Sequence, residues 1–454
     1  MRRVRRGAQA AAVGEYLRGA LWVLPGTAAA LALLAGILLS RVRIPPDSLW
    51  YPLAFPGAAD DARQVLITIA STIVTVIALV LGLTIVTLQL ASTQFSPRLL
   101  RNFLRDRPNQ VVLATFVATF AYSTAGLYTV RATVGADVPR LAVSGAIALA
   151  FLSLGMLVFF VHHIVHSIKI DTIMNSVVEA AVRTAQDYTP KAPGVDRAGP
   201  VPPPEALALP ARRSGYVQTV LPGLLLRTAA GQDAVVVVVP RVGDHVVAGT
   251  VPLALAWSRR GGPPRNAPAL ARALHHAVQI GPERTLQQDV MFGIRQLVDI
   301  ALRALSPAIN DPYTGVQVLD RLSVLIAMLG GRALGDDIRA DRAGVVRVAA
   351  AGPAFADCLD LACGQIRRCG AAEPAVCLAL LRLLGTAAAS VTDTRRRAAV
   401  TDQARLVLAD AESRIARPDD RAAVRELGIR LLTTTAAAPP PAGPHPARKD
   451  DRRA

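Results

Sequence analysis

The sequence predicts a mainly α membrane protein, with four transmembrane helices followed by a cytoplasmic α+β domain. Hydrophobic residues make up 52% of its 454 residues and charged residues only 18%, whereas soluble domains carry about 25% charged residues. Four apolar runs without Asp, Glu, Lys or Arg lie at residues 21–40, 65–90, 111–130 and 141–165. About 20 such residues in a helix span the hydrocarbon core of a bilayer. This composition excludes a chain that is disordered throughout.

The first run follows a basic leader that contains Arg2, Arg3, Arg5 and Arg6. A cleaved signal peptide has an apolar core of about 7–15 residues, and the first run is longer. We therefore expect a retained first helix. The second run is the longest of the four, so its helix should tilt or project beyond the bilayer.

The basic residues of the short loops predict the orientation. More Lys and Arg lie before the first run and between the second and third runs than in the other two loops. Because cytoplasmic loops are enriched in Lys and Arg, we expect both termini to be cytoplasmic. A reporter fused after Asp171 should then lie in the cytoplasm.

The second run carries a stripe of small and polar residues. At about 100° per residue, the side chains of the stripe fall within about 100° of one another on a helix. They are Thr68, Ser71, Thr72, Thr75, Gly82 and Gln89. Such residues let membrane helices approach closely and hydrogen-bond, which is one interpretation. The other is a hydrated pathway, in which Thr68, Ser71, Thr72, Thr75 and Gln89 line a pore.

The runs contain no carboxylate and no Arg, which argues against a proton-coupled or voltage-sensing mechanism. Between the second and third runs, residues 91–110 form a basic elbow. Ser96 and Pro97 are typical of a helix start and predict a short amphipathic helix over residues 97–106. Its role is expected to be contact with anionic lipid headgroups, at roughly 1 kcal/mol per basic residue; a gate or ligand contact is the alternative. The membrane-surface candidates are Arg98, Arg101, Arg105 and Arg107.

Histidines end the fourth run. His162 and His166 are four residues apart and share a helical face, a spacing that lets two imidazoles reach one metal ion. No acidic residue or Cys adjoins them, so hydrogen bonding at the interface or between helices is the simpler interpretation. They are weak metal candidates, and a pH-sensing role is a further alternative.

The composition divides the chain into five parts. The transmembrane domain covers residues 1–170, and a helical extension with a Pro-rich linker covers 171–213. Short β-prone runs separated by Gly, Pro and Asp predict a small β unit at 214–258. A helical domain is expected at 259–435, followed by a disordered Pro/Ala tail at 436–454.

The densest polar set of the chain lies on a predicted helical hairpin within the helical domain. Apolar residues at 3–4 spacing from Val290 predict the first helix, and a turn with two prolines precedes the second. Three roles are open: a structural ion-pair and capping network, a ligand or ion pocket, or a hydrolytic site. The ligand-pocket candidates are Arg284, Asp289, Arg295, Asp299, Asn310, Asp311 and Asp320.

Catalytic and cofactor motifs give no positive signal. The sequence has no Walker loop, GxGxxG, HExxH or GxSxG pattern, so we assign no catalytic residue and expect no cofactor. The formal net charge is +17, but aromatic residues make up only 4% and no interleaved basic and aromatic pattern is present. Nucleic acid is therefore not an expected partner.

Several long motifs resemble a bacterial family of predicted membrane proteins catalogued as domain of unknown function 2254. They are Gln94-Phe-Ser-Pro-Arg-Leu-Leu-Arg-Asn-Phe-Leu-Arg-Asp106, His162-His163, Gly215-Tyr-Val217, Arg284-Thr-Leu-Gln-Gln-Asp-Val-Met-Phe-Gly-Ile-Arg-Gln-Leu-Val-Asp-Ile-Ala and Leu305-Ser-Pro-Ala-Ile-Asn-Asp-Pro312. The resemblance covers roughly residues 15–430. It implies four membrane helices with a cytoplasmic domain, in the bacterial cytoplasmic membrane. It brings no established activity and no ligand residues.

Three functions remain open from the sequence. The first is a homo-oligomeric pore or transport protein of the membrane, lined by the second run and controlled by the cytoplasmic domain. The second is a membrane-tethered scaffold or sensor whose cytoplasmic pocket binds a small ligand. The third is a membrane-bound hydrolase. The expected partners are the lipid bilayer, anionic headgroups and further copies of the chain.

Overall fold

The computed structural model describes residues 22–42, 55–94, 107–130, 138–167, 169–190 and 194–437. The chain forms two compact units, Met1–Ile173 and Met174–Ala454. We call them the N-terminal and C-terminal units and describe each by itself. The predicted tail from residue 438 onward lies outside the described residues.

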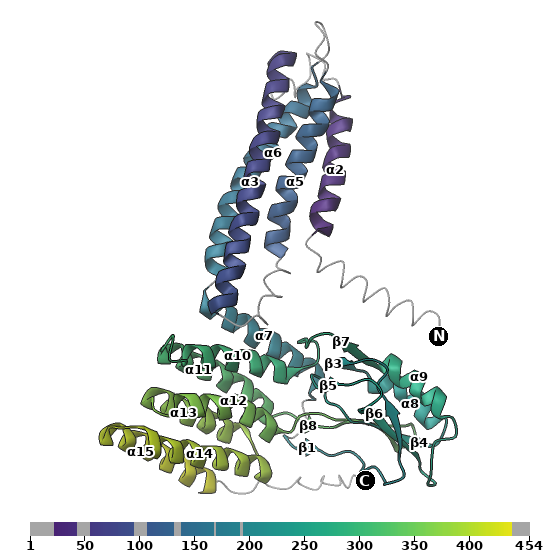
Figure 1. Ribbon diagram of the computed structural model, residues 1–454, viewed down its shortest axis with the longest axis vertical. Helices are drawn as coiled ribbons and strands as arrows, with labels where there is room; N and C mark the ends of the chain where they lie inside the picture. Colours follow the sequence, from purple (N-terminus) through teal and green to yellow (C-terminus); the bar gives the residue numbers. More distant parts are fainter. Residues whose placement is uncertain are drawn as a thin grey trace, which may run out of the picture. The chain divides into compact units, whose positions relative to one another are not determined.

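The N-terminal unit is built from helices α2 (Val23–Leu39), α3 (Ala59–Gln94), α5 (Arg107–Thr129) and α6 (Arg140–Ser167) (Figure 1). Helix α5 packs against the other three. The approach of α2 to α5 requires a glycine, because a Cβ at Gly36 would lie 2.9 Å from the Cβ of Ala125 and from the carbonyl oxygen of Tyr122. Close helix packing through small residues is typical of membrane helices.

By length and composition, three described stretches can cross a membrane: Ala59–Gln89, Arg107–Thr129 and Arg140–His166. Helix α2 is apolar but has only 17 residues, about 26 Å at 1.5 Å per residue. Three of the four expected runs therefore correspond to candidate spans, and the first corresponds to this shorter helix.

The basic elbow is only partly described. Its first residues continue α3 as far as Gln94, and α5 begins at Arg107. The predicted short helix at residues 97–106 lies outside the described residues, and so do Arg98, Arg101 and Arg105.

The C-terminal unit contains a five-stranded sheet in the order β2-β6-β4-β10-β9. Its strands are β2 (Leu207–Pro210), β6 (Pro252–Ser258), β4 (Ala234–Val238), β10 (Val346–Ala350) and β9 (Asp337–Ala340). Only the β10–β4 pair is parallel, with Val348 opposite Val236. Its other neighbouring strands pair antiparallel.

Two smaller sheets and two helices complete this part of the unit. Strands β5 (His245–Val246), β3 (Gly215–Val220) and β7 (Val278–Gly281) form an antiparallel sheet. Strands β1 (Asp196–Arg197) and β8 (Leu334–Gly335) form a parallel pair. Apolar residues of β3, β5 and β7 share one buried core with α8 (Pro222–Ala230) and α9 (Ala267–Ala277), including Leu225, Leu270 and Leu274.

Six helices form three stacked hairpins in the C-terminal unit (Figure 1). They are α10 (Val290–Ala304) with α11 (Pro312–Gly330), α12 (Phe355–Gly370) with α13 (Pro374–Ser390), and α14 (Thr394–Arg414) with α15 (Pro418–Ala437). Each hairpin packs on the next. Helix α7 (Ile170–Tyr188) is tied to the first hairpin by a hydrogen bond from Arg321 Nε to Asn175 Oδ1, 3.0 Å.

The strands extend well beyond the predicted β unit at residues 214–258. Strand β2 lies in the segment predicted as a Pro-rich linker, and β7, β8, β9 and β10 lie in the segment predicted as helical. The physical reason is that β10 gains its pairing from β4, more than a hundred residues earlier. A partner at that distance leaves no local pattern for sequence reasoning to find.

Candidate functional site

Helix α3 has two opposite faces. Its buried face contains Ala62, Leu66, Ile73, Val80 and Thr87 and packs against α5 and α6. Every residue of the polar stripe, from Thr68 to Gln89, is exposed in the isolated chain. At about 100° per residue, the centre of the stripe lies about 140° from the centre of the buried face. The stripe therefore does not pack against the helices of its own chain that the structure describes.

Most hydroxyls of the stripe are satisfied within α3. Thr68 donates to the carbonyl oxygen of Gln64 at 2.8 Å, and Thr75 donates to that of Ser71 at 3.3 Å. The Ser71 hydroxyl bonds to the carbonyl of Thr68 at 3.1 Å. Such local bonds lower the cost of placing a hydroxyl in an apolar environment. Because these bonds stay within α3, the stripe can face water, lipid or another helix.

Helix α5 carries a set of buried polar residues that the sequence did not single out. Thr119 and Ser153 of α6 are hydrogen-bonded through their hydroxyl oxygens at 2.9 Å, and both are buried. Helix α5 also buries Gln110, Tyr122 and Ser123. The available signal was the spacing of Thr115, Thr119 and Ser123, which repeats every four residues in the third run.

The histidines of α6 lie together but form an incomplete metal site. The ring centroids of His162 and His166 are 4.1 Å apart, and His166 Nδ1 is 2.9 Å from the carbonyl oxygen of His162. His163 stacks on Phe159 with ring centroids 5.8 Å apart. Within the described part of the chain, no group of three His, Cys, Asp or Glu residues could hold a metal ion.

The ligand-pocket candidates of the predicted hairpin do not lie together in the structure. Asp289 caps the start of α10 and Asp311 caps the start of α11, each by accepting a bond from a backbone N–H three residues on. The 15 residues of α10 separate these caps by about 22 Å at 1.5 Å per residue. One pocket cannot contain both carboxylates.

The residues near the second cap hold the backbone in place. Asn310 has φ +51°, and Asp311 Oδ2 accepts a bond from the Thr314 hydroxyl at 2.5 Å. The hydrogen bonds of Thr314 hold the pKa of Asp311 below its ordinary value. Asp320 is exposed on α11. These three residues have capping and surface roles.

Arg295 and Asp299 join neighbouring helices. Arg295 Nε lies 2.7 Å from Asp299 Oδ1 on the same helix, and Arg295 Nη1 donates to Gln365 Oε1 of α12 at 2.8 Å. Arg295 therefore has an ion pair within α10 and a hydrogen bond to α12.

Asp289 and Arg284 form a buried junction between the strands and the helices. Asp289 is 2% exposed, and its Oδ2 lies 2.7 Å from Arg284 Nη2. Gly243, with φ +96°, brings the β4–β5 loop against this pair, because a Cβ there would lie 2.3 Å from Asp289 Oδ2. Burial raises the pKa of Asp289, although Arg284 opposes the shift. A buried carboxylate with a raised pKa beside a cavity is a common feature of functional sites.

Asp289 borders a cavity of about 160 Å³ within the C-terminal unit. The wall combines the end of α7, the start of α10 and the edges of β1, β8, β9 and β10. The polar and charged residues of the wall are Tyr188, Thr189, Arg197, Gln288, Asp289, Asp336, Asp337 and Arg339. An open groove of about 480 Å³ shares Tyr188, Asp337 and Arg339 with this wall.

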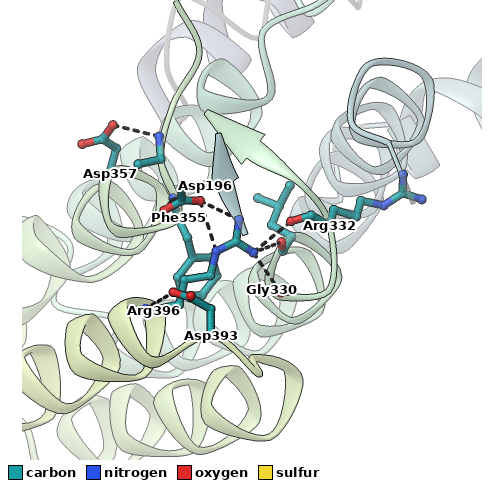
Figure 2. Close-up of polar contacts among 9 residues, drawn as sticks. Asp196, Gly330, Arg332, Phe355, Asp357, Asp393 and Arg396 are labelled. Atoms are coloured by element: carbon teal, nitrogen blue, oxygen red, sulfur yellow. Dashed lines mark hydrogen bonds and ion pairs between the residues drawn. The ribbon is translucent and has the colours of Figure 1, made fainter. Parts of the chain in front are cut away.

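The buried Arg396 holds together segments that contribute to the wall of this cavity. Arg396 is 1% exposed and lies at the start of α14 (Figure 2). Its Nη2 lies 2.5 Å from Asp196 Oδ1, and its Nη1 donates to the carbonyl oxygens of Gly330 and Arg332 at 3.0 and 2.9 Å. The guanidinium also lies 5.3 Å from the ring centroid of Phe355. Arg396 thus ties β1, α11 and α12 to α14.

Apolar helices long enough to cross a bilayer, joined to an α+β unit with an internal cavity, define a mainly helical membrane protein. The chain belongs to the family of predicted membrane proteins called domain of unknown function 2254, which it matches over residues 18–386. This confirms the resemblance inferred from the motifs.

Two relatives are similar along most of their length. Proteins described as uncharacterized from Mycobacterium bovis and Mycobacterium tuberculosis strain H37Rv are each 47% identical over 421 residues. The alignment covers 91% of this chain and 80% of each relative. No solved structure matches the chain.

Proposed function

We propose that this protein is a homo-oligomer of the bacterial cytoplasmic membrane that forms a pore or transport path along α3, controlled by the C-terminal unit. The observation that supports this proposal is the orientation of the stripe. Thr68, Ser71, Thr72, Thr75 and Gln89 are all exposed, while the opposite face of α3 is buried against its own chain.

A path between copies suits the packing of the N-terminal unit. Apart from the buried polar residues of α5 and α6, the inner surfaces of α3, α5 and α6 are packed with apolar side chains such as Phe116 and Phe160. A stripe that faced lipid would leave the exposed amide of Gln89 with unmet donors and acceptors in hydrocarbon, which is costly. Contact with water or with the same stripe of other copies removes that cost.

The topology is part of the proposal. We include α2 as a fourth span and place both termini in the cytoplasm, with the basic residues 98–107 at anionic headgroups. A reporter fused after Asp171 tests the orientation. Periplasmic activity of that reporter contradicts the topology.

Ion flux in liposomes tests the pore. Thr72→Leu places a bulky apolar side chain in the stripe and should reduce flux at least fivefold. Val74→Leu is the matched control, because Val74 is 49% exposed but lies away from the stripe; its flux should equal that of the unmodified protein. A monomeric mass in detergent, or no flux from the unmodified protein, contradicts the proposal.

A second candidate function has its own supporting observation. The cavity bordered by Asp289 favours a membrane-attached sensing protein whose C-terminal unit binds a small ligand. The two functions are compatible, because a ligand in this cavity is a means of controlling the helices. They are separable by experiment, because binding and flux are measured independently.

A further inference from the structure

The cavity of the C-terminal unit has the size and lining of a site for a small molecule. Its volume is about 160 Å³, and an apolar protein cavity of roughly 150 Å³ holds one benzene molecule. The apolar part of its wall includes Val220, Val242, Val290, Leu329, Leu334 and Ala350. A ligand whose apolar body is about the size of a benzene ring fits these dimensions.

The carboxylates of the wall are already engaged. Asp289 is paired with Arg284, and Asp336 Oδ2 accepts a bond from the backbone N–H of Gly199 at 2.7 Å. Asp337 Oδ1 lies 2.9 Å from Arg339 Nε. Two of these three carboxylates are thus already paired with an arginine.

Arg197 is the charged group of the wall that remains available. Among the residues that the structure describes, its guanidinium has no ion pair, and the residue is exposed. A guanidinium presents a planar fork of N–H donors that matches a carboxylate with two parallel hydrogen bonds. Arg197 is therefore the group of the wall that is best suited to bind an anionic ligand.

The strand pairing fixes the position of Arg197. Its Cα is paired with Gly335 of β8, and its carbonyl oxygen accepts the backbone N–H of Asp336 at 3.0 Å. Successive side chains of a strand point to opposite sides. Asp196 contacts Arg396 (Figure 2), and Arg197 belongs to the wall of the cavity. In the two-residue strand β1, Asp196 therefore has a structural contact with Arg396, whereas Arg197 faces the cavity side.

We propose that the cavity binds a small carboxylic acid, with its apolar body among the aliphatic side chains and its carboxylate on Arg197. This inference deepens the sensing role of the C-terminal unit proposed above. It requires neither a pore nor a particular oligomer, so a failure of ion flux would leave it standing.

Binding of benzoate to the full-length protein in detergent, measured by isothermal titration calorimetry, tests the proposal. Benzoate should bind saturably, and benzamide, which has the same shape without the charge, should bind at least tenfold more weakly. Arg197→Gln should weaken benzoate binding at least tenfold, and Arg197→Lys should weaken it less. Arg213→Gln is the matched control, because Arg213 is exposed and outside the cavity wall; its affinity should stay within twofold.

The binding measurements can either support the carboxylate site or overturn it. Thermal unfolding of each variant verifies that the protein is folded. Absence of saturable benzoate binding by the folded unmodified protein overturns the proposal, and so does equal affinity for benzamide. Hexanoate should bind as benzoate does. Dodecanoate exceeds the volume of the cavity and should bind more weakly; tighter binding would assign the site to a lipid acyl chain instead.

Discussion

The two units satisfy their polar side chains in different ways. In α3 of the N-terminal unit, hydroxyls bond to carbonyl oxygens three or four residues earlier, as Thr68 does to Gln64. In the C-terminal unit, ion pairs join distant segments: Arg347 Nη1 of β10 lies 2.6 Å from Asp233 Oδ1, and Arg396 contacts Asp196. Local bonds leave the orientation of a helix open, whereas distant pairs determine which segments lie together.

The largest effect is expected where a distant pair is broken. Arg396→Met removes a buried cation, so that Asp196 loses its ion-pair partner and the carbonyl oxygens of Gly330 and Arg332 lose their guanidinium donor. The free energy of unfolding of the C-terminal unit should fall by about 3–5 kcal/mol. Urea unfolding followed by the fluorescence of Trp257 measures it, with Trp22 and Trp50 replaced by Phe so that only β6 reports.

Arg395→Met is the control for this comparison. Arg395 is adjacent in the chain but exposed, so its replacement should change stability by less than about 0.5 kcal/mol. Equal effects of the two substitutions would show that Arg396 does not hold the segments together.

The second effect concerns pH. Because burial raises the pKa of Asp289, the folded unit favours the protonated carboxyl more than the unfolded chain does. The contribution of this group to stability is therefore greatest below the ordinary Asp pKa and falls as pH rises through the folded pKa. The free energy of unfolding should be measured against pH for the unmodified protein and for Asp289→Asn. The advantage of the unmodified protein over the variant should decline between the ordinary Asp pKa and the raised pKa of folded Asp289. A difference that grows with pH would mean that Arg284 dominates instead.

The smallest effect is expected in the N-terminal unit. Thr119→Val removes the hydrogen bond to Ser153 between α5 and α6 and should cost about 0.6 kcal/mol, the average for such bonds in membranes. Thr124→Val should cost less, because the exposed Thr124 bonds only to the carbonyl oxygen of Phe120 in its own helix. Unfolding in SDS followed by circular dichroism compares the two variants. Equal costs would remove the distinction between local and tertiary hydroxyl bonds.

The helices of the C-terminal unit could be predicted because their signal is local. Apolar residues at 3–4 spacing indicated α10, and an Asp just before each helix of the first hairpin provided its cap. The sheet could not be predicted in full, because β10 is held by β4 and by no neighbour within its own stretch except β9. Pairing over such distances depends on the whole fold.

The candidate sites were predicted to different extents. Periodicity placed Thr68 and Thr75 on one face of α3, but it could not say which face meets a neighbouring helix. The sequence singled out Asp289 and Arg284, but not Arg197, because the cavity draws together residues that lie far apart in the chain. Arg396 lies between Arg395 and Arg397, and nothing in that run of arginines distinguishes the buried one from its neighbours.

The contact between Asp196 and Arg396 also sets an order of assembly. The two residues are 200 positions apart, so a ribosome that adds about 5–20 residues per second makes the second one roughly 10–40 s after the first. Until Arg396 has been made, β1 can pair with β8, but Asp196 lacks the arginine that contacts it. The segment that carries Arg197 therefore gains its contact with α14 only after Arg396 has been made, and a nascent chain cut short before α14 should be cleaved there by proteases that spare the mature protein.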